Sequence, residues 1–488
     1  MSYYDTLYKV VFMDDEDIEI LDLDEEIIYT KKEVIVETRI IPNNSNVIKE
    51  EVNKKSKKTK RKYGIGEKIF LVISILFILG SIAFYGYRTY YYYHKTHDVV
   101  KNITIKDKLT ALNNLAYQND GLYEDNGYFY YKGIDVNNYV YYSGRLFRII
   151  DISNGIRMIE QDTETNLIWG IDTDYKESNI HKWLANYLNT LKDYDIYLMK
   201  NDWCNEKIDL DNYQCNDTIN DYVGLLNIED YMQAGAKNSY LNNETYFWTL
   251  NFDKDGNPLY INNEGNINNI YKKEDNYFSY GIRPVITLKS DISIVSGDGS
   301  NEDPFIIEEL GNALLKDNSI GSYVNYNDRS YRILSIDDKG VELISNEVID
   351  KDLKYDEVYK YLNNEFIKEL TKEDLVKNNY DITEYSLKNK YELTDKKTKS
   401  NYVIIPSIGD LFLNDSNGYW LNNYSDKELG LYYILDENNM FFSDLKTNSY
   451  KIRPIIKLNI ETVVSSGLGT KDKPLIINEE GDKDDKEN

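Results

Sequence analysis

YVYYSGRLFRII at Tyr139–Ile150 recurs as YVNYNDRSYRIL at Tyr323–Leu334. Five further blocks recur in the same order: KWL and KYL at Lys182 and Lys360, YVGLLNIEDY and YVIIPSIGDL at Tyr222 and Tyr402, YFWTLN and GYWLNN at Tyr246 and Gly418, IRPVITL and IRPIIKL at Ile282 and Ile452, and SGDGSNEDPFII and SGLGTKDKPLII at Ser296 and Ser466. Self-similarity at a nearly constant spacing indicates a repeated structural unit. The sequence therefore predicts two copies of one domain, over residues 120–308 and 309–478.

The pattern inside the first copy predicts its elements. Tyr139–Ile152 is dense in aromatic and β-branched residues around a Ser-Gly pair, which predicts a β-hairpin. Ile156–Gln161 follows an Asn-Gly turn and is expected to continue the sheet. Glu177–Leu191 spaces its apolar residues along one helical face, with Ser178 or Asn179 as the N-cap. Because strands and helices mix without a βαβ rhythm, we expect an α+β fold with antiparallel sheets in both copies.

A long apolar stretch precedes the repeats. Ile69–Tyr87, IFLVISILFILGSIAFYGY, holds nineteen residues without a charge, and a helix of that length spans a hydrocarbon core of roughly 30 Å. The basic run KKSKKTKRK at Lys54–Lys62 lies before it, and such flanks stay on the cytoplasmic side. The sequence predicts a single-pass signal anchor in the cell membrane, with the N-terminus cytoplasmic and the C-terminal domains extracytoplasmic. The alternatives are a buried helix of a soluble protein and a cleaved signal peptide.

Composition assigns the remaining segments. Residues 1–68 change from acidic to polybasic, which predicts a disordered cytoplasmic tail. Within it, residues 1–30 are either a solvated tail or a segment that folds on a cytoplasmic partner. Residues 88–119 are expected to form a stalk, and residues 479–488 a charged tail. The net charge of −26 argues against nucleic acid as a partner.

Two motifs in each copy carry a family resemblance. The openings are Phe147–Ile150 and Tyr331–Leu334, and the endings are Arg283–Val285 and Arg453–Ile455. They resemble the Trp-Arg-Ile-Ile opening and Arg-Pro-Val ending of an uncharacterised extracytoplasmic domain family of Gram-positive bacterial surface proteins. The resemblance implies single-pass anchoring and no established activity. More distantly, the order of a short helix, a Trp strand and an Arg-bearing last strand resembles the C-type-lectin-like fold of formylglycine-generating proteins.

Charged and aromatic residues that occur at matching positions in both copies are the site candidates. These candidates are Trp248, Trp420, Arg283 and Arg453 for ligand binding, and Arg148, Arg332, Asp230 and Asp410 for structural ion pairs. The tryptophans are either stacking platforms for sugars or core anchors. An arginine fork could bind a carboxylate or sulfate, or it could tie the last strand to the short helix.

The sequence offers no catalytic signature. It contains no G-x-S-x-G, H-E-x-x-H or P-loop motif, so we predict no catalytic residue, metal site or cofactor. The S-x-x-K at Ser443–Lys446 lacks its companion motifs, and His181 is replaced by Tyr359 in the second copy. Cys204 and Cys215 are the only cysteines and are predicted to form a disulfide, with two free thiols as the alternative.

The leading hypothesis is therefore a membrane-anchored cell-surface protein that displays two binding domains for a glycan or a protein. One alternative is an envelope hydrolase or transferase without a recognisable motif. Another is a transmembrane coupler that relays outer binding to a cytoplasmic partner of residues 1–30. Paired carboxylates that face one cleft would favour the enzyme, and a shallow aromatic groove would favour the binding protein.

Overall fold

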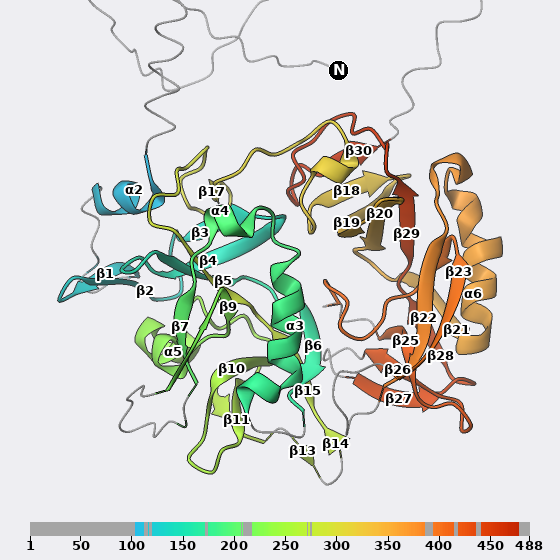
Figure 1. Ribbon diagram of the computed structural model, residues 1–488, viewed down its shortest axis with the longest axis horizontal. Helices are drawn as coiled ribbons and strands as arrows, with labels where there is room; N and C mark the ends of the chain where they lie inside the picture. The colour runs from blue at the N-terminus through green and yellow to red at the C-terminus, as the bar shows by residue number, and fades with distance from the viewer. Residues whose placement is uncertain are drawn as a thin grey trace, which may run out of the picture. The chain divides into compact units, whose positions relative to one another are not determined.

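The computed structural model describes residues 103–111, 116, 120–170, 174–205, 207, 217–270, 272–273, 276–385, 394–413, 418–435 and 441–477 (Figure 1). All of them belong to one compact unit of the chain, Gly80–Asn488. Strands hold 43% of the described residues and helices 16%. The described chain is thus predominantly β, which corrects the α+β class expected from the mixed sequence pattern.

The first repeat contains two sheets. The larger one comprises β1 (Gly121–Asp125), β2 (Tyr128–Lys132), β3 (Tyr139–Tyr142), β4 (Arg145–Asp151), β5 (Ile156–Glu160), β9 (Val223–Gly224), β16 (Val285–Leu288) and β17 (Phe305–Ile306). The smaller one comprises β6 (Thr165–Ile168), β10 (Phe247–Phe252), β11 (Pro258–Ile261), β12 (Ile267–Asn268) and β15 (Ser279–Ile282). Two short ladders complete the repeat, β7 (Asn201–Cys204) with β8 (Thr218–Asp221) and β13 (Lys272–Lys273) with β14 (Asn276–Tyr277). Its helices are α3 (Asn179–Leu188), α4 (Tyr194–Tyr197) and α5 (Ile228–Ala234), and α2 (Ile105–Ala111) precedes it.

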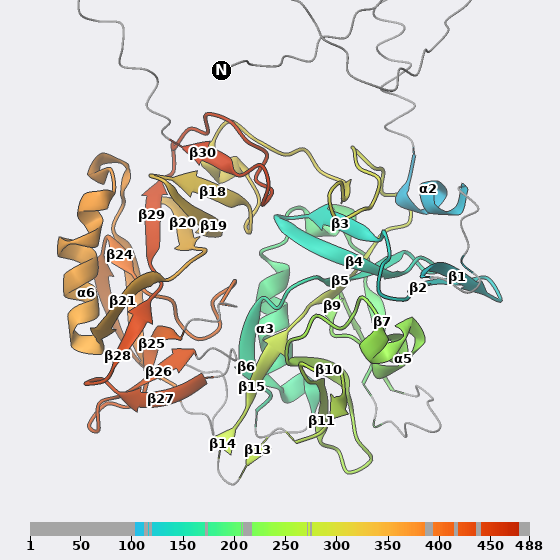
Figure 2. The same ribbon diagram turned by 180° about the vertical axis from the view of Figure 1, so that it is seen from behind.

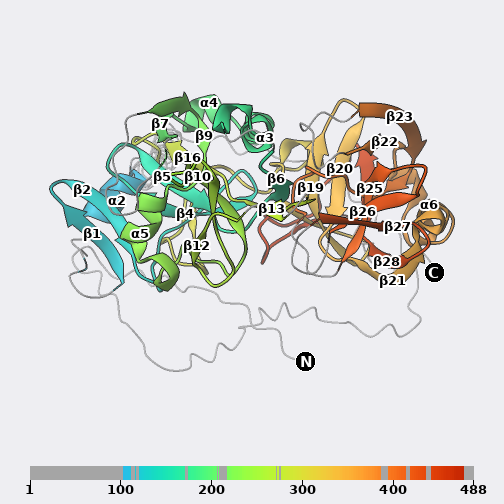
Figure 3. The same cartoon turned by 90° about the horizontal axis from the view of Figure 1, so that it is seen from below.

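The second repeat also contains two sheets and one α-helix, α6 (Tyr355–Asn364). The first sheet comprises β18 (Tyr323–Tyr326), β19 (Arg329–Ile336), β20 (Gly340–Ser345), β24 (Val403–Ile404), β29 (Ile455–Asn459) and β30 (Leu475–Ile477). The other comprises β21 (Ile349–Lys354), β22 (Asn378–Glu384), β23 (Thr394–Asn401), β25 (Tyr419–Asp426), β26 (Leu431–Leu435), β27 (Phe441–Leu445) and β28 (Ser449–Ile452). β25 pairs with both β22 and β26, so this sheet branches there (Figure 3).

The eight-stranded sheet of the first repeat and the six-stranded sheet of the second share one strand order. It runs β9-β16-β5-β4-β3-β17 in the first repeat and β24-β29-β20-β19-β18-β30 in the second. In both sheets, the last strand lies parallel to the strand that opens the repeated hairpin, β17 beside β3 and β30 beside β18. Parallel pairs also join β10 to β15 and β25 to β28. The sheets therefore mix a few parallel pairs with antiparallel ones, which corrects the wholly antiparallel sheets expected from the sequence. The C-type-lectin-like resemblance stays a prediction.

Glycine turns place that last strand. Gly297 and Gly467 have positive φ angles of 95° and 100°. A Cβ atom on either glycine would collide with the carbonyl oxygen of the proline that opens the strand, Pro304 or Pro474. Only glycine therefore permits the tight return that sets β17 and β30 against their sheets.

The helix predicted over Glu177–Leu191 is confirmed as α3. Ser178 is its N-cap, because its hydroxyl accepts a hydrogen bond from the amide of His181 at 3.1 Å. Trp183 and Tyr187 are buried on the inner face of the helix. α6 is the counterpart of α3 in the second repeat and packs on β21, β24 and β28 (Figure 2).

Three predictions fall on residues outside those described. The expected transmembrane helix over Ile69–Tyr87 is one, and the two tails are the others. α3 and α6 have ten residues each, and no helix in the described part of the chain is both long and apolar enough to cross a membrane. Cys215 also lies outside, so no disulfide joins two described cysteines, although Cys204 at the end of β7 is not a free thiol.

Candidate functional site

The two tryptophans proposed as ligand platforms lie in the core. The side chains of Trp248 and Trp420 are both 0% exposed. Each indole donates a hydrogen bond to a backbone carbonyl of the strand two places away in its sheet, Trp248 to Leu167 at 2.8 Å and Trp420 to Leu353 at 2.7 Å. Both residues therefore anchor their repeats and present no face to a ligand.

The arginines of the Arg-Pro motifs are also buried. Each guanidinium donates to two backbone carbonyl oxygens, Arg283 to Glu160 (3.0 Å) and Leu241 (2.5 Å), and Arg453 to Ser345 (2.7 Å) and Phe412 (2.6 Å). Burial lowers the pKa of Arg283 to about 10. Neither arginine forms an ion pair with a described carboxylate. Through these hydrogen bonds, each arginine holds a loop of its own repeat against the sheet.

Arg148 and Arg332 differ in their partners. Arg148 stays within the first repeat and donates to the side chain of Asn138 at 2.6 Å. Arg332 donates to Gly321 at 2.9 Å and also reaches Gly144 of the first repeat at 3.0 Å. The expected pairing of these arginines with the repeated aspartates does not occur. Arg332 instead helps to join the two repeats.

Asp230 has a different cation as its partner. Its carboxylate on α5 lies 2.6 Å from Arg157 on β5, and the same guanidinium lies 2.5 Å from Asp151 on β4. The pair thus ties the short helix to β5 and not to the last strand of the sheet. Sequence comparison of the copies missed Arg157 because the second copy has no arginine there.

Strand register identifies the residue that replaces Arg157. Arg157 lies opposite Thr287 of the Arg-Pro strand, and Glu342 lies opposite Lys457 at the matching place in the second repeat. Ser335 corresponds to Asp151 in the same way, because Asp151 lies opposite Arg157 and Ser335 lies opposite Glu342. The second repeat therefore keeps the aspartate, as Asp410, but replaces its cation with a carboxylate.

Asp410 and Glu342 line a cleft of about 390 Å³ between the two repeats. The first repeat contributes the side of α3 and the residue position just after it, with Trp183, Asn186, Tyr187 and Thr190. The second repeat contributes polar and aromatic groups from β19, β20, β22 and the loop before β25, among them Ser335, Asn379, Tyr380, Asp381 and Ser407. Neither repeat alone encloses this space.

The electrostatics of the cleft are acidic. Burial, and secondarily the neighbouring Glu342, raises the pKa of Asp410 to about 7, although its carboxylate accepts a hydrogen bond from the amide of Ser407 at 2.8 Å. Glu342 accepts from the hydroxyl of Ser335 at 2.6 Å and lies 3.6 Å from Lys457. Within the described chain, no cation lies at ion-pair distance from Asp410. A half-buried acid facing another acid is thus left without a counterion.

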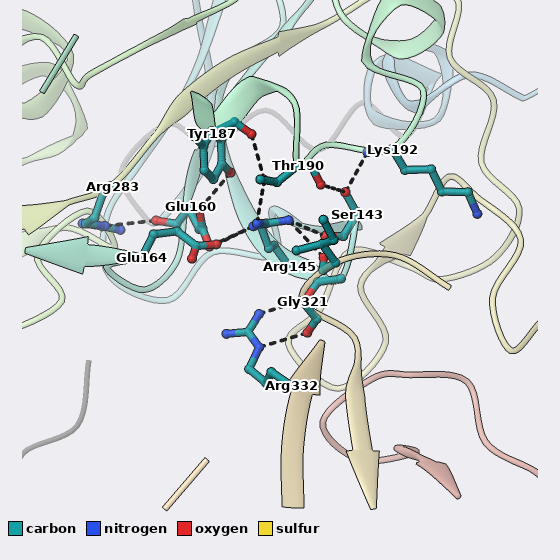
Figure 4. Close-up of polar contacts among 12 residues, drawn as sticks. Ser143, Arg145, Glu160, Glu164, Tyr187, Thr190, Lys192, Arg283, Gly321 and Arg332 are labelled. Carbon is teal, nitrogen blue, oxygen red and sulfur yellow. Dashed lines mark hydrogen bonds and ion pairs between the residues drawn. The ribbon is translucent and has the colours of Figure 1, made fainter. Parts of the chain in front are cut away.

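A buried polar network supports the α3 side of the cleft (Figure 4). The hydroxyl of Tyr187 donates to Glu160 at 3.0 Å, and that of Thr190 accepts from Arg145 at 3.0 Å. Arg145 also pairs with Glu164, and its side chain is 0% exposed. Burial and the adjacent Glu164 raise the pKa of Glu160 well above its usual range, which favours the protonated form of this carboxyl in the folded protein.

Hydrogen bonds across the junction hold the cleft in shape. Those that join the repeats include Trp183 Nε1 to Gly409 O (2.8 Å), Leu413 N to Glu164 O (3.1 Å), Arg332 Nη2 to Gly144 O (3.0 Å), Tyr141 Oη to Gly469 O (2.8 Å) and Phe441 N to Ser279 Oγ (2.8 Å). Two of these bonds involve Gly409 and Leu413, which lie close to Asp410 in the chain. The position of the acid relative to α3 is therefore fixed by the docking of the repeats.

Comparison with protein-family models, curated proteins and solved structures finds no match to this chain. The resemblance to the extracytoplasmic domain family stays a prediction from the motifs.

Proposed function

We propose that the two repeats form one binding module, which holds a hydroxyl-rich ligand of the glycan class in the cleft between them. The cleft itself carries this proposal. Binding pockets combine apolar and aromatic walls with a few placed polar groups. Trp183, Tyr187 and Tyr380 line this cleft beside amide, hydroxyl and carboxylate side chains that suit sugar hydroxyls.

Glycan-array binding of residues 120–478, followed by calorimetry on the best oligosaccharide, tests the proposal. Asn186→Ala removes an exposed amide of α3 that lines the cleft. Lys182→Ala, one turn earlier on the same helix and outside the cleft lining, is the matched control. We expect the Asn186 variant to bind several-fold more weakly and the Lys182 variant to bind as the parent protein does. Equal affinity of all three proteins would place the ligand elsewhere.

A glycoside hydrolase is the second candidate, and the acid pair favours it. Perturbed carboxyl groups that share a cleft are typical of active sites, and a carboxyl with a pKa of about 7 retains the proton that a general acid needs. Release of reducing ends from a bound glycan, lost in Asp410→Asn, would establish this reaction. Binding without turnover would leave the binding module as the function.

A further inference from the structure

The two repeats place side chains of opposite charge beside their matching aspartates. In the first, Asp230 has the guanidinium of Arg157 at 2.6 Å. In the second, the matching Asp410 faces Glu342 at the position of that arginine. The same fold therefore has a built place for a cationic group, which the first repeat fills with its own side chain.

The described residues supply no full replacement for the missing cation. Among the described cations, Lys457 forms an ion pair with Glu342, and its ammonium lies 2.5 Å from Asp337 and 3.6 Å from Glu342. That lysine is 4% exposed and is held by these two acids. The α3 side contributes only neutral groups, and Asp381 adds a third acid to the cleft. The cleft is therefore acidic on one wall, and that wall is accessible.

We propose that the ligand of this cleft carries a cationic amino group, which binds between Asp410 and Glu342 at the place that the guanidinium of Arg157 occupies in the first repeat. The inference rests on the proposed glycan-binding function and narrows the ligand class to glycans with free amino groups. An ammonium group there forms charge-assisted hydrogen bonds with both carboxylates. N-acetylation removes the charge and fills the space that the acids leave open.

Calorimetry on residues 120–478 at pH 7 tests the inference with three probes: a glucosamine trisaccharide, an N-acetylglucosamine trisaccharide and a trilysine peptide. We expect the glucosamine trisaccharide to bind about tenfold or more tightly than its N-acetylated form, a difference of about 1.4 kcal/mol. Equal affinity for the two sugars overturns the inference and leaves the proposed glycan binding intact. Binding of neither sugar overturns both. Binding of trilysine alone contradicts the assignment to a glycan.

The substitution Glu342→Arg rebuilds the arrangement of the first repeat. We expect it to raise the melting temperature and to abolish the preference for the free amine, because the new guanidinium takes the place of the ligand's cation. Asp352→Arg on exposed β21 makes the same charge change outside the cleft and should alter neither property. The nearly isosteric Glu342→Gln should weaken the preference in a folded protein. A preference that survives both Glu342 substitutions would overturn the inference.

Discussion

At the scale of single residues, the protonation of Glu160 makes stability depend on pH. Its pKa in the folded protein lies well above the ordinary value of 4.5, because burial and Glu164 disfavour a second charge. The folded state therefore holds a proton that the unfolded chain releases above about pH 4.5. This contribution to stability is fully present below that pH and is lost as the pH rises towards the folded pKa. Asp410 adds a dependence of the same sign between its ordinary pKa of 3.8 and about 7.

Glu160→Gln tests this sign. The amide stays neutral, so the free energy of unfolding of the variant should fall less between pH 5 and pH 8 than that of the parent protein. Urea denaturation at four pH values measures the two slopes. Glu177→Gln changes an exposed glutamate and should reproduce the parent slope. Parallel slopes for the Glu160 variant and the parent would show that this carboxyl is ionised in the folded state.

Removal of Arg283 should destabilise the first repeat. Arg283→Ala leaves the carbonyl oxygens of Glu160 and Leu241 buried without that donor, and unsatisfied buried groups destabilise by about 1–3 kcal/mol each. We expect a loss of about 3 kcal/mol in the free energy of unfolding, measured by urea denaturation. Lys254→Ala, on an exposed turn, serves as the control. An unchanged stability with lost glycan binding would move Arg283 from a structural to a binding role.

At the scale of elements, the turn between β3 and β4 forms part of the junction. Gly144 has a φ of 70°, and a Cβ there would lie 2.5 Å from the amide nitrogen of Ser322 and 2.6 Å from the carbonyl oxygen of Ile320. The matching turn between β18 and β19 has Asp328, which is exposed. The same hairpin thus receives a neighbouring segment in one repeat and faces solvent in the other.

Gly144→Ala should therefore destabilise the junction between the repeats, by about 1–3 kcal/mol from the backbone conformation alone. The loss is larger if the segment Ile320–Ser322 must also move. Thermal melting of residues 120–478 measures the loss. Asp328→Asn substitutes the matching position with a residue that also tolerates its φ of 59°, and it should leave the melting temperature within about 1 °C, as is usual for exposed sites. A larger effect at Asp328 than at Gly144 would contradict the role assigned to this turn.

At the scale of the whole described unit, the repeats are expected to melt together. The buried network of Arg145 and Glu164 is completed by the carbonyl of Ile320 and the amide of Leu413, both from beyond the first repeat. Residues 120–308 alone should melt roughly 5–10 °C below residues 120–478, since a few hydrogen bonds of about 1 kcal/mol each are lost. Calorimetry should show one transition for the tandem protein. Two transitions that match those of the separate fragments would show that the repeats are independent.

Local patterns in the sequence were enough to predict several elements. The duplication is visible because six blocks recur in the same order. The hairpin of Tyr139–Ile152 and the capped helix α3 are visible because each depends on residues close together in the chain. The parallel last strand was missed, since apolar periodicity does not tell which edge of a sheet a strand joins. The buried state of Trp248 and Arg283 was one of two readings that the sequence left open.

The sequence by itself thus determined the two copies and their local elements, because neighbouring residues set turns, caps and amphipathic faces. Only the tertiary structure brought Asp410 and Glu342 to one cleft and set them against α3 of the other repeat. These residues lie in different elements, and their approach depends on strand register and on the docking of one repeat onto the other. One signal was present in the printed chain: the arginine at position 157 is matched by the glutamate at position 342. Its meaning depended on knowing that both positions face the repeated aspartate.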